Sequence, residues 1–134
     1  MDISATLDWA SNRKHGVVIT PRKDGRAQSS DVVYAVIDGR IGASLTDDRA
    51  KTCNMRRNDR VVFHITDPNS WSCASIDGTV ELSPVTTDPA HALVAAYRAV
   101  AGEHDEPDEF RAAMAGESRL VACLTPESVT GQIH

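Results

Sequence analysis

The sequence predicts a single, mainly β domain: a barrel or rolled sheet of about six mostly antiparallel strands with peripheral helices. Short β-branched segments recur along the 134 residues, and tight-turn dipeptides separate the first of them. Strands do not alternate regularly with helices, and no Gly-x-Gly-x-x-Gly pattern follows a strand. A doubly wound parallel sheet is therefore not expected.

The first third of the chain predicts one helix and three strands. Residues 3–12 place apolar side chains on one helical face. Asp24-Gly25 and Asp38-Gly39 are hairpin-turn signals. Segments 16–20, 28–37 and 40–45 are therefore expected to form an antiparallel meander.

The remainder of the chain predicts further helices and strands. Candidate helix-start residues at 46–48 precede a helix of two turns over 50–57. The other elements are expected as strands over 60–66 and 71–82 (bent near Asp77-Gly78), helices over 90–101 and from 107 to about 116, and strands over 119–124 and 129–133.

The composition is that of a soluble globular domain, with 41% hydrophobic and 25% charged residues. A chain of this length can bury one core without disulfides or metal, so residues 1–134 are expected to form one domain. A net charge of −5 argues against a nucleic-acid-binding surface. No apolar run is long enough to span a membrane, and no secretory signal is visible, so a cytoplasmic location is expected.

Few residues of this chain suggest metal binding or nucleophilic catalysis. The three cysteines and five histidines are scattered and lack zinc-ligand spacing, so no metal site is predicted. Free, buried or half-buried thiols are the simplest interpretation of the cysteines. No Gly-x-Ser-x-Gly motif or pair of catalytic carboxylates can be singled out, so the catalytic residues stay unknown.

Positive charge is concentrated in residues 49–60. This segment holds five of the 14 basic residues and one acid, Asp59, whereas the rest of the chain holds 9 basic and 18 acidic residues. A cationic segment in an acidic chain indicates an anion site or an ion-pair network. A solvated surface helix is the alternative, and Arg56 and Arg57 are expected to pair with Asp59 or with solvent.

Four residues of this segment are suited to bind an anion. The expected helix start would add free backbone N–H groups and the positive end of the helix dipole. Lys51 and Asn54 share a helical face, and Thr52 supplies a hydroxyl nearby. Arg49 can bind an anion through its guanidinium fork.

Two further places in the sequence could meet a ligand. Gln28, Ser29 and Ser30 begin a strand, where their side chains either bond to a ligand or face solvent. Trp71 begins another strand and either stacks on a planar ring or plugs the end of the barrel.

Six segments in consistent order resemble a known superfamily. The most diagnostic is R-A-K-T-C-N-M-R-R at residues 49–57, and the others are residues 16–20, 24–30, 71–72, 77–82 and 97–104. Together they resemble the flavin and deazaflavin oxidoreductases that include pyridoxamine 5′-phosphate oxidase. The similarity is greater to the actinobacterial branch that uses the 8-hydroxy-5-deazaflavin coenzyme F-420.

The resemblance implies a split β-barrel homodimer with the coenzyme in a cleft at the subunit interface. It also implies roles for particular residues: Arg49, Lys51, Thr52 and Asn54 for the phosphate and tail of the coenzyme, Gln28, Ser30 and Ser44 for its ring or ribityl chain, and Trp71 for the border of the substrate pocket.

The implied function is a reductase that transfers a hydride from reduced F-420 to an electron-poor conjugated small molecule, such as an enone, a quinone or a tetrapyrrole. Such a reaction requires binding, orientation and exclusion of water more than an acid–base pair. Three alternatives stay open: an FMN-binding oxidoreductase, a protein that carries F-420 without its own reaction, and a structural dimer that binds no coenzyme. The substrate and the proton donor are not determined by the sequence.

Overall fold

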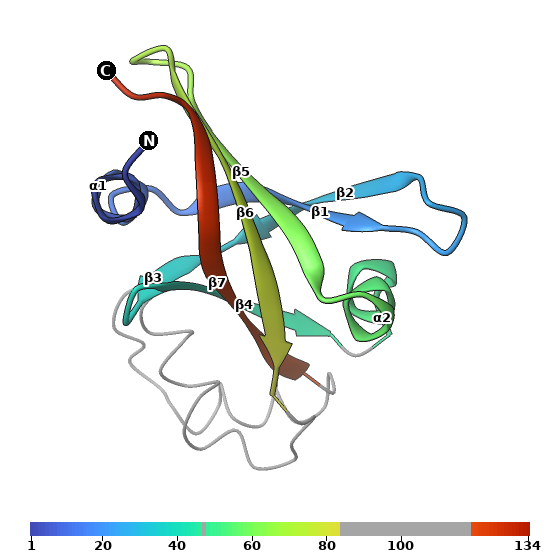
Figure 1. Cartoon of the computed structure of the whole chain (residues 1–134). Coiled ribbons are helices and arrows are strands. Elements are labelled where there is room, and N and C mark those ends of the chain that lie inside the picture. Colours follow the sequence, from blue (N-terminus) through green and yellow to red (C-terminus); the bar gives the residue numbers. More distant parts are fainter. Residues whose placement is uncertain (47, 84–118) are drawn as a thin grey trace.

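Figure 1 shows the computed structural model of the chain, which describes residues 1–46, 48–83 and 119–134. The predicted helices over 90–101 and 107–116 lie outside the described residues. The described elements are α1 (Ile3–Ala10), β1 (His15–Pro21), β2 (Ala27–Val33), β3 (Ala35–Ile37), β4 (Arg40–Thr46), α2 (Ala50–Arg57), β5 (Arg60–Asp67), β6 (Ser72–Leu82) and β7 (Arg119–Gln132).

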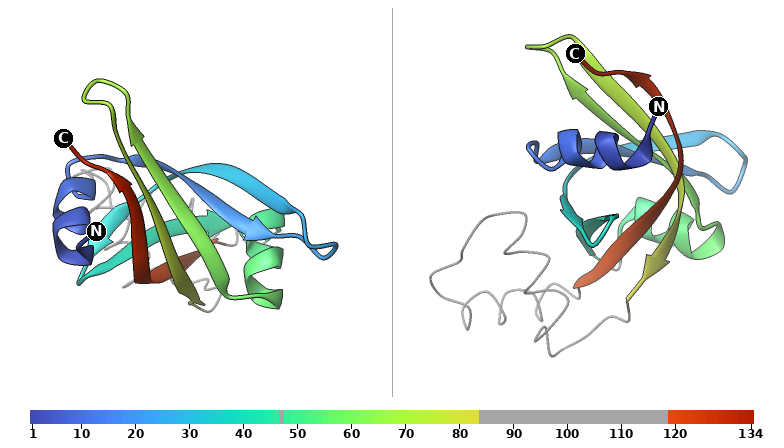
Figure 2. Two further views of the ribbon diagram at one scale, coloured as in Figure 1. Left: turned by 45° about the horizontal axis from the view of Figure 1, so that its top comes forward. Right: turned by 60° about the vertical axis from the view of Figure 1, so that its left-hand side comes forward.

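The strands form one rolled antiparallel sheet. Its order is β2-β1-β5-β6-β7-β4-β3, and every neighbouring pair is antiparallel. Figures 1 and 2 show α1 and α2 on opposite sides of this half-barrel. The predicted fold class is confirmed, with seven strands in the described residues rather than about six. None of the described helices has the length and apolar character needed to cross a membrane.

The predicted three-stranded meander is wrong in one respect. Segment 28–37 is not one strand but divides into β2 and β3 at Tyr34. β2 pairs with β1, whereas β3 pairs with β4, so the two halves lie at opposite edges of the sheet order. Tyr34 and Ala35 are both buried, which breaks the alternation of a continuous strand. Because one bent segment supplies both edges, the sheet has to roll up.

Alternate side chains from the strands fill the inside of the roll. Val18, Val61, Phe63, Ile76 and Leu124 come from four different strands and are each at most 4% exposed. A cavity within this core has a volume of about 20 Å³ and an apolar lining. That space holds about one water molecule, so a coenzyme-sized ligand has to bind outside the core.

β6 bends at the predicted place. Its register against β7 shifts between Asp77, which lies opposite Ser128, and Gly78, which lies opposite Pro126. Glu127 is therefore the extra residue of a β-bulge.

β7 continues through this bulge. It runs over 14 residues, so the two strands expected over 119–124 and 129–133 are one. Pro126 does not end the strand because it stands beside the bulge, where a missing backbone N–H is tolerated.

β6 and β7 approach each other closely at Gly78, beside the bulge, so a larger residue at this position tests the packing there. A Cβ added there would lie 2.4 Å from the carbonyl oxygen of Thr125. We expect Gly78→Ala to lower the free energy of unfolding by about 2 kcal/mol, as overpacking does. In Gly42→Ala the new Cβ would meet Ile37 Cδ1 at an ordinary 3.5 Å, so this control should lose less than about 1 kcal/mol. Equal urea midpoints for the two variants would contradict the prediction.

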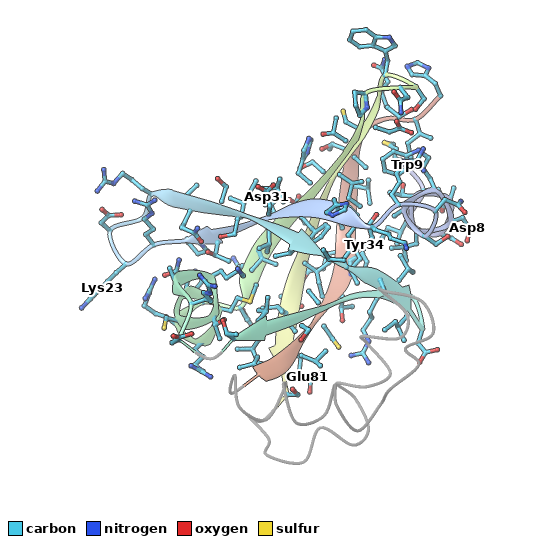
Figure 3. All side chains as sticks on the ribbon, turned by 180° about the vertical axis from the view of Figure 1, so that it is seen from behind. Asp8, Trp9, Lys23, Asp31, Tyr34 and Glu81 are labelled. Carbon is cyan, nitrogen blue, oxygen red and sulfur yellow. The ribbon has the colours of Figure 1, made fainter. Side chains whose placement is uncertain are left out.

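Tyr34 joins the bend to the N-terminal helix. Its hydroxyl donates to the carbonyl of Ala10 at 2.7 Å, and its backbone N–H donates to the carbonyl of Lys14 at 2.9 Å. Its ring meets Phe63 edge-on, with the centroids 5.2 Å apart. Figure 3 shows the side chain inside the molecule. Burial raises the pKa of Tyr34 to about 12.

The raised pKa of Tyr34 predicts a loss of stability at alkaline pH. The unfolded chain releases the phenol proton near pH 10, whereas the folded chain keeps it to about pH 12. The contribution of Tyr34 is therefore complete below pH 10 and decreases as the pH rises from 10 to 12. Tyr34→Phe should be less stable at pH 7 by about 1 kcal/mol for the lost hydrogen bond. Its unfolding free energy should then fall less steeply than that of the wild type between pH 10 and 12, and parallel curves would contradict this.

Candidate functional site

α2 forms over the predicted residues, but its start differs from the prediction. The N-cap is Arg49 and not a residue of 46–48, and no side chain caps the helix by a hydrogen bond. Arg49 instead bonds back to Thr46, through its backbone N–H to the carbonyl at 3.4 Å and through Nε to Oγ1 at 3.2 Å. The first-turn N–H groups are therefore not occupied by a cap side chain, which suits an anion.

The fold brings a second group of cations to α2. The hairpin between β1 and β2 carries Arg22, Lys23 and Arg26, all exposed, and Figure 3 shows Lys23 at its tip beside α2. Arg57 of α2 donates to the carbonyl of Pro21 in this hairpin at 3.1 Å. More than twenty positions separate these residues from α2, so no local sequence pattern groups them with it.

We call the resulting patch the α2–hairpin surface. It consists of eight of the 14 basic residues: Arg22, Lys23, Arg26, Arg49, Lys51, Arg56, Arg57 and Arg60. Seven are exposed and Lys51 is half-buried. Among its cations, Arg26 bonds to Asp24, and this hydrogen bond holds the pKa of Asp24 below its usual value.

The start of α2 is fastened to the end of β4. The hydroxyl of Thr52 is fully buried and donates to the carbonyl of Thr46 at 2.8 Å, so its hydrogen is already used inside the protein. Ser44 stands two residues before Thr46 on the same face of β4, opposite the face that carries Leu45 into the core. Ser44 is therefore about 7 Å from the residue that holds the start of α2.

The buried face of α2 continues into a chain of hydrogen bonds that we call the polar relay. Arg57 Nη2 lies 2.7 Å from Asn54 Oδ1, and Asn54 Nδ2 lies 3.0 Å from Thr20 Oγ1. Thr20 Oγ1 is 3.3 Å from Gln28 Oε1, and Gln28 Nε2 is 2.7 Å from Ser30 Oγ. The fold thus connects three predicted site residues, Asn54, Gln28 and Ser30. Among the described residues Arg57 bonds to Asn54 and Pro21 and not to Asp59, and it is also exposed to solvent, which was the other expectation.

Trp71 is not part of this cluster. It lies in the turn between β5 and β6, has a φ of 56° and is 83% exposed, so it does not plug the barrel. α2 leads into the start of β5, whereas Trp71 follows its end. The eight residues of β5 span about 26 Å. Trp71 therefore lies far from the α2 of its own chain.

A groove of about 590 Å³ adjoins the α2–hairpin surface on the outside of the sheet. Its lining includes Pro21 and Gly25 from the hairpin, Asn58 and Arg60 after α2, and Glu127 from the bulge. This volume is within the range of small-molecule sites. Its walls come from distant segments, so the sequence alone did not indicate it.

The described residues contain three free thiols and no cluster of potential metal ligands. No group of three or more potential metal ligands is found among them. Cys73 and Cys123 are half-buried, as expected, whereas Cys53 on α2 is exposed, and all three are free thiols.

Comparison with solved structures shows which fold class this is. The chain has the split β-barrel fold of the pyridoxamine 5′-phosphate oxidase-like proteins. No family model matches it.

Three solved structures illustrate the likeness. A conserved hypothetical protein from Mycobacterium tuberculosis has 22% identity and a TM-score of 0.80, over 98% of this chain and 84% of that one. A structure named as an F-420 reductase has 22% identity and a TM-score of 0.68, over 87% and 89%. A pyridoxamine 5′-phosphate oxidase candidate from Listeria innocua has 17% identity and a TM-score of 0.69, over 96% of each chain. The F-420 and pyridoxamine 5′-phosphate oxidase-like proteins expected from residues 49–57 are thus among the structural neighbours.

The polar relay predicts that removing the hydroxyl of Thr20 lowers the free energy of unfolding more than removing an exposed hydroxyl does. Thr20→Val preserves shape but removes the Thr20 hydroxyl that bonds to Asn54 Nδ2 and to Gln28 Oε1. We expect a loss of about 1–3 kcal/mol in the free energy of unfolding. Thr66→Val, on the exposed side of β5, is the matched control and should change stability by less than about 0.5 kcal/mol. If both variants had the same urea midpoint, the relay would not contribute to stability.

Proposed function

We propose that this protein is a deazaflavin-dependent reductase, which transfers a hydride from reduced F-420 to an electron-poor conjugated small molecule. The observation that supports it most is the α2–hairpin surface, a cationic site beside an open helix start in an acidic chain. The fold shared with a protein named as an F-420 reductase supports the same coenzyme class.

The residues present fit a phosphate-bearing coenzyme. Arg49 is exposed and Lys51 half-buried at the open start of α2, so both can donate to a phosphate together with the first-turn N–H groups. Thr52 and Asn54 have side chains that are at most 8% exposed and already bonded to the protein. We propose that these two contribute by fixing the helix start and, for Thr52, by its backbone N–H.

The ring of the coenzyme would lie between two strands that flank α2. Gln28 and Ser30 stand on β2, and Ser44 stands on β4 near the start of α2. Trp71 is too far from the α2 of its own chain to border the same site. We therefore propose a homodimer in which Trp71 of a second copy borders the substrate pocket. We also propose that this dimer is cytoplasmic.

Chemically, the coenzyme would supply the hydride, and the protein would supply a fixed geometry. Arg49 and Lys51 would hold the anionic end, while the polar residues of β2 and β4 would fix the ring. The adjoining groove of about 590 Å³ gives space for a substrate beside the site.

An FMN-dependent oxidoreductase is the second candidate, because the same cations would bind the phosphate of FMN. A protein that carries F-420 without its own reaction is the third. Fluorescence titration of the purified protein with F-420 and, separately, with FMN distinguishes the first two. Tight binding of F-420 and weak binding of FMN would support the proposal, the reverse would favour FMN, and no binding of either would reject both. Turnover with enone and quinone acceptors then separates the reductase from the carrier.

Lys51 gives the sharpest single test of the phosphate site. Lys51→Ala should weaken coenzyme binding at least tenfold, which corresponds to about 1.4 kcal/mol. The matched control is Lys14→Ala, an exposed lysine between α1 and β1 that lies outside the α2–hairpin surface. The dissociation constant of Lys14→Ala for the coenzyme should stay within twofold of the wild-type value. An unchanged affinity in Lys51→Ala would remove Lys51 from the site.

A further inference from the structure

The hydrogen bonds of the polar relay run in one fixed direction. The guanidinium of Arg57 can only donate, so the Asn54 atom 2.7 Å from it must be the acceptor Oδ1. The amide nitrogen of Asn54 then faces Thr20 and donates to its Oγ1 at 3.0 Å. The hydroxyl of Thr20 accepts this bond and keeps its own hydrogen to donate onward.

The other end of the relay requires the same direction. Gln28 Nε2 lies 2.9 Å from the carbonyl oxygen of Ser29, which can only accept. The oxygen of the Gln28 amide must therefore face Thr20, at 3.3 Å, and accept the Thr20 hydrogen. Two independent groups at opposite ends thus fix both amide orientations.

Ser30 is the last member of the relay. Its Oγ accepts from Gln28 Nε2 at 2.7 Å, which leaves the Ser30 hydrogen to donate elsewhere. Within the described residues, the structure shows no bond donated by the Ser30 hydroxyl. Ser30 is half-buried on β2, the strand at one edge of the sheet order. The positive charge of Arg57 polarises the whole chain of bonds in the same sense and strengthens Ser30 as a donor.

We propose that Ser30 donates this hydrogen bond to an acceptor on the ring of the bound coenzyme, with the polar relay setting its direction. The inference rests on the proposed function and adds the chemistry of one contact. The atom that meets Ser30 is a carbonyl oxygen or an unprotonated ring nitrogen, never an N–H group. Flavins and deazaflavins share a pyrimidinedione edge with such acceptors, so Ser30 serves either coenzyme. Thr20 and Arg57 are positioning residues because they act through Asn54 and Gln28.

The test measures dissociation constants by fluorescence titration with F-420 and with FMN. Ser30→Ala removes the donor and should weaken binding about fivefold, the usual value of one hydrogen bond. Ser29→Ala, the exposed neighbour on the other face of β2, is the matched control and should bind as the wild type does. Equal affinities of Ser30→Ala and Ser29→Ala would overturn the inference.

Gln28→Glu tests the direction of the relay with a side chain of the same size, and it also replaces the bond to the Ser29 carbonyl by a contact between two acceptors. A carboxylate only accepts, so it takes hydrogens from both Thr20 and Ser30 and leaves Ser30 with lone pairs facing the ring. We expect binding to weaken at least fivefold. Adding Ser30→Ala to Gln28→Glu should then change the dissociation constant less than twofold, because the donor is already lost.

This double-mutant cycle separates the effect of the hydrogen-bond direction from the effect of the negative charge that Gln28→Glu introduces. The new carboxylate also repels an anionic coenzyme, but it does so equally with Ser or Ala at position 30, so this repulsion cancels in the cycle. Fully additive losses would show that Gln28 and Ser30 act independently and would overturn the relay. Thr20→Ser, which keeps the hydroxyl, should bind within twofold of the wild type, whereas Thr20→Val should bind at least threefold more weakly.

The outcomes also distinguish this inference from the proposed function. If the folded wild-type protein binds neither F-420 nor FMN, both fail. If it binds one of them and Ser30→Ala binds equally tightly, the proposed function stands and the inference fails. Urea midpoints of each variant confirm that the proteins compared are folded.

Discussion

The bend at Tyr34 is the constraint on which the rest of the structure depends. The segment before it is the strand at one edge of the sheet order, and the segment after it is the strand at the other. Two hydrogen bonds from Tyr34 and its contact with Phe63 hold this bend against the core. Both edge strands, β2 and β3, belong to one short segment, so closing the sheet brings β2 near β4, the partner of β3. α2 follows β4 directly and therefore has β2 on one side and the end of β4 on the other. The flanking of α2 by two strands, and with it the candidate site, follows from closing the sheet.

α2 is held in this position mainly by polar contacts. Met55 is its one buried apolar residue, whereas Thr52 and Asn54 are buried polar residues. Apolar packing on its own would allow a short helix to slide or rotate, since the hydrophobic effect is not directional. The bonds from Thr52 to β4 and from Asn54 to β1 fix its position along and around its axis. The helix that carries the cations is thus oriented by the same side chains that the sequence pattern singled out as ligands.

Local signals predicted most of the elements of this fold, and long-range contacts account for what they missed. The Asp-Gly turns, the helix over 50–57 and the bend near Gly78 each depend on a few neighbouring residues. The break at Tyr34 depends on Lys14 and Ala10, which lie far back in the chain. β7 continues past Pro126 because its pairing with β6 accommodates Glu127 as a bulge, and the sequence around Pro126 does not encode that partner strand.

The candidate site shows the same division between local and long-range information. The pattern over residues 49–57 identified the helix and its cations, because all of them are local. It missed Thr20, a buried residue without charge on a distant strand, whose single hydroxyl both accepts from Asn54 and donates to Gln28. It also assigned Thr52 and Asn54 to ligand binding, which stays a prediction, and the structure adds that both side chains are buried and bonded within the protein. In the proposed complex, these bonds would both seat α2 and orient the hydroxyl of Ser30, so stability and ligand geometry would have one physical origin. A substitution in the relay would then change both, whereas one at the exposed cations would change affinity alone.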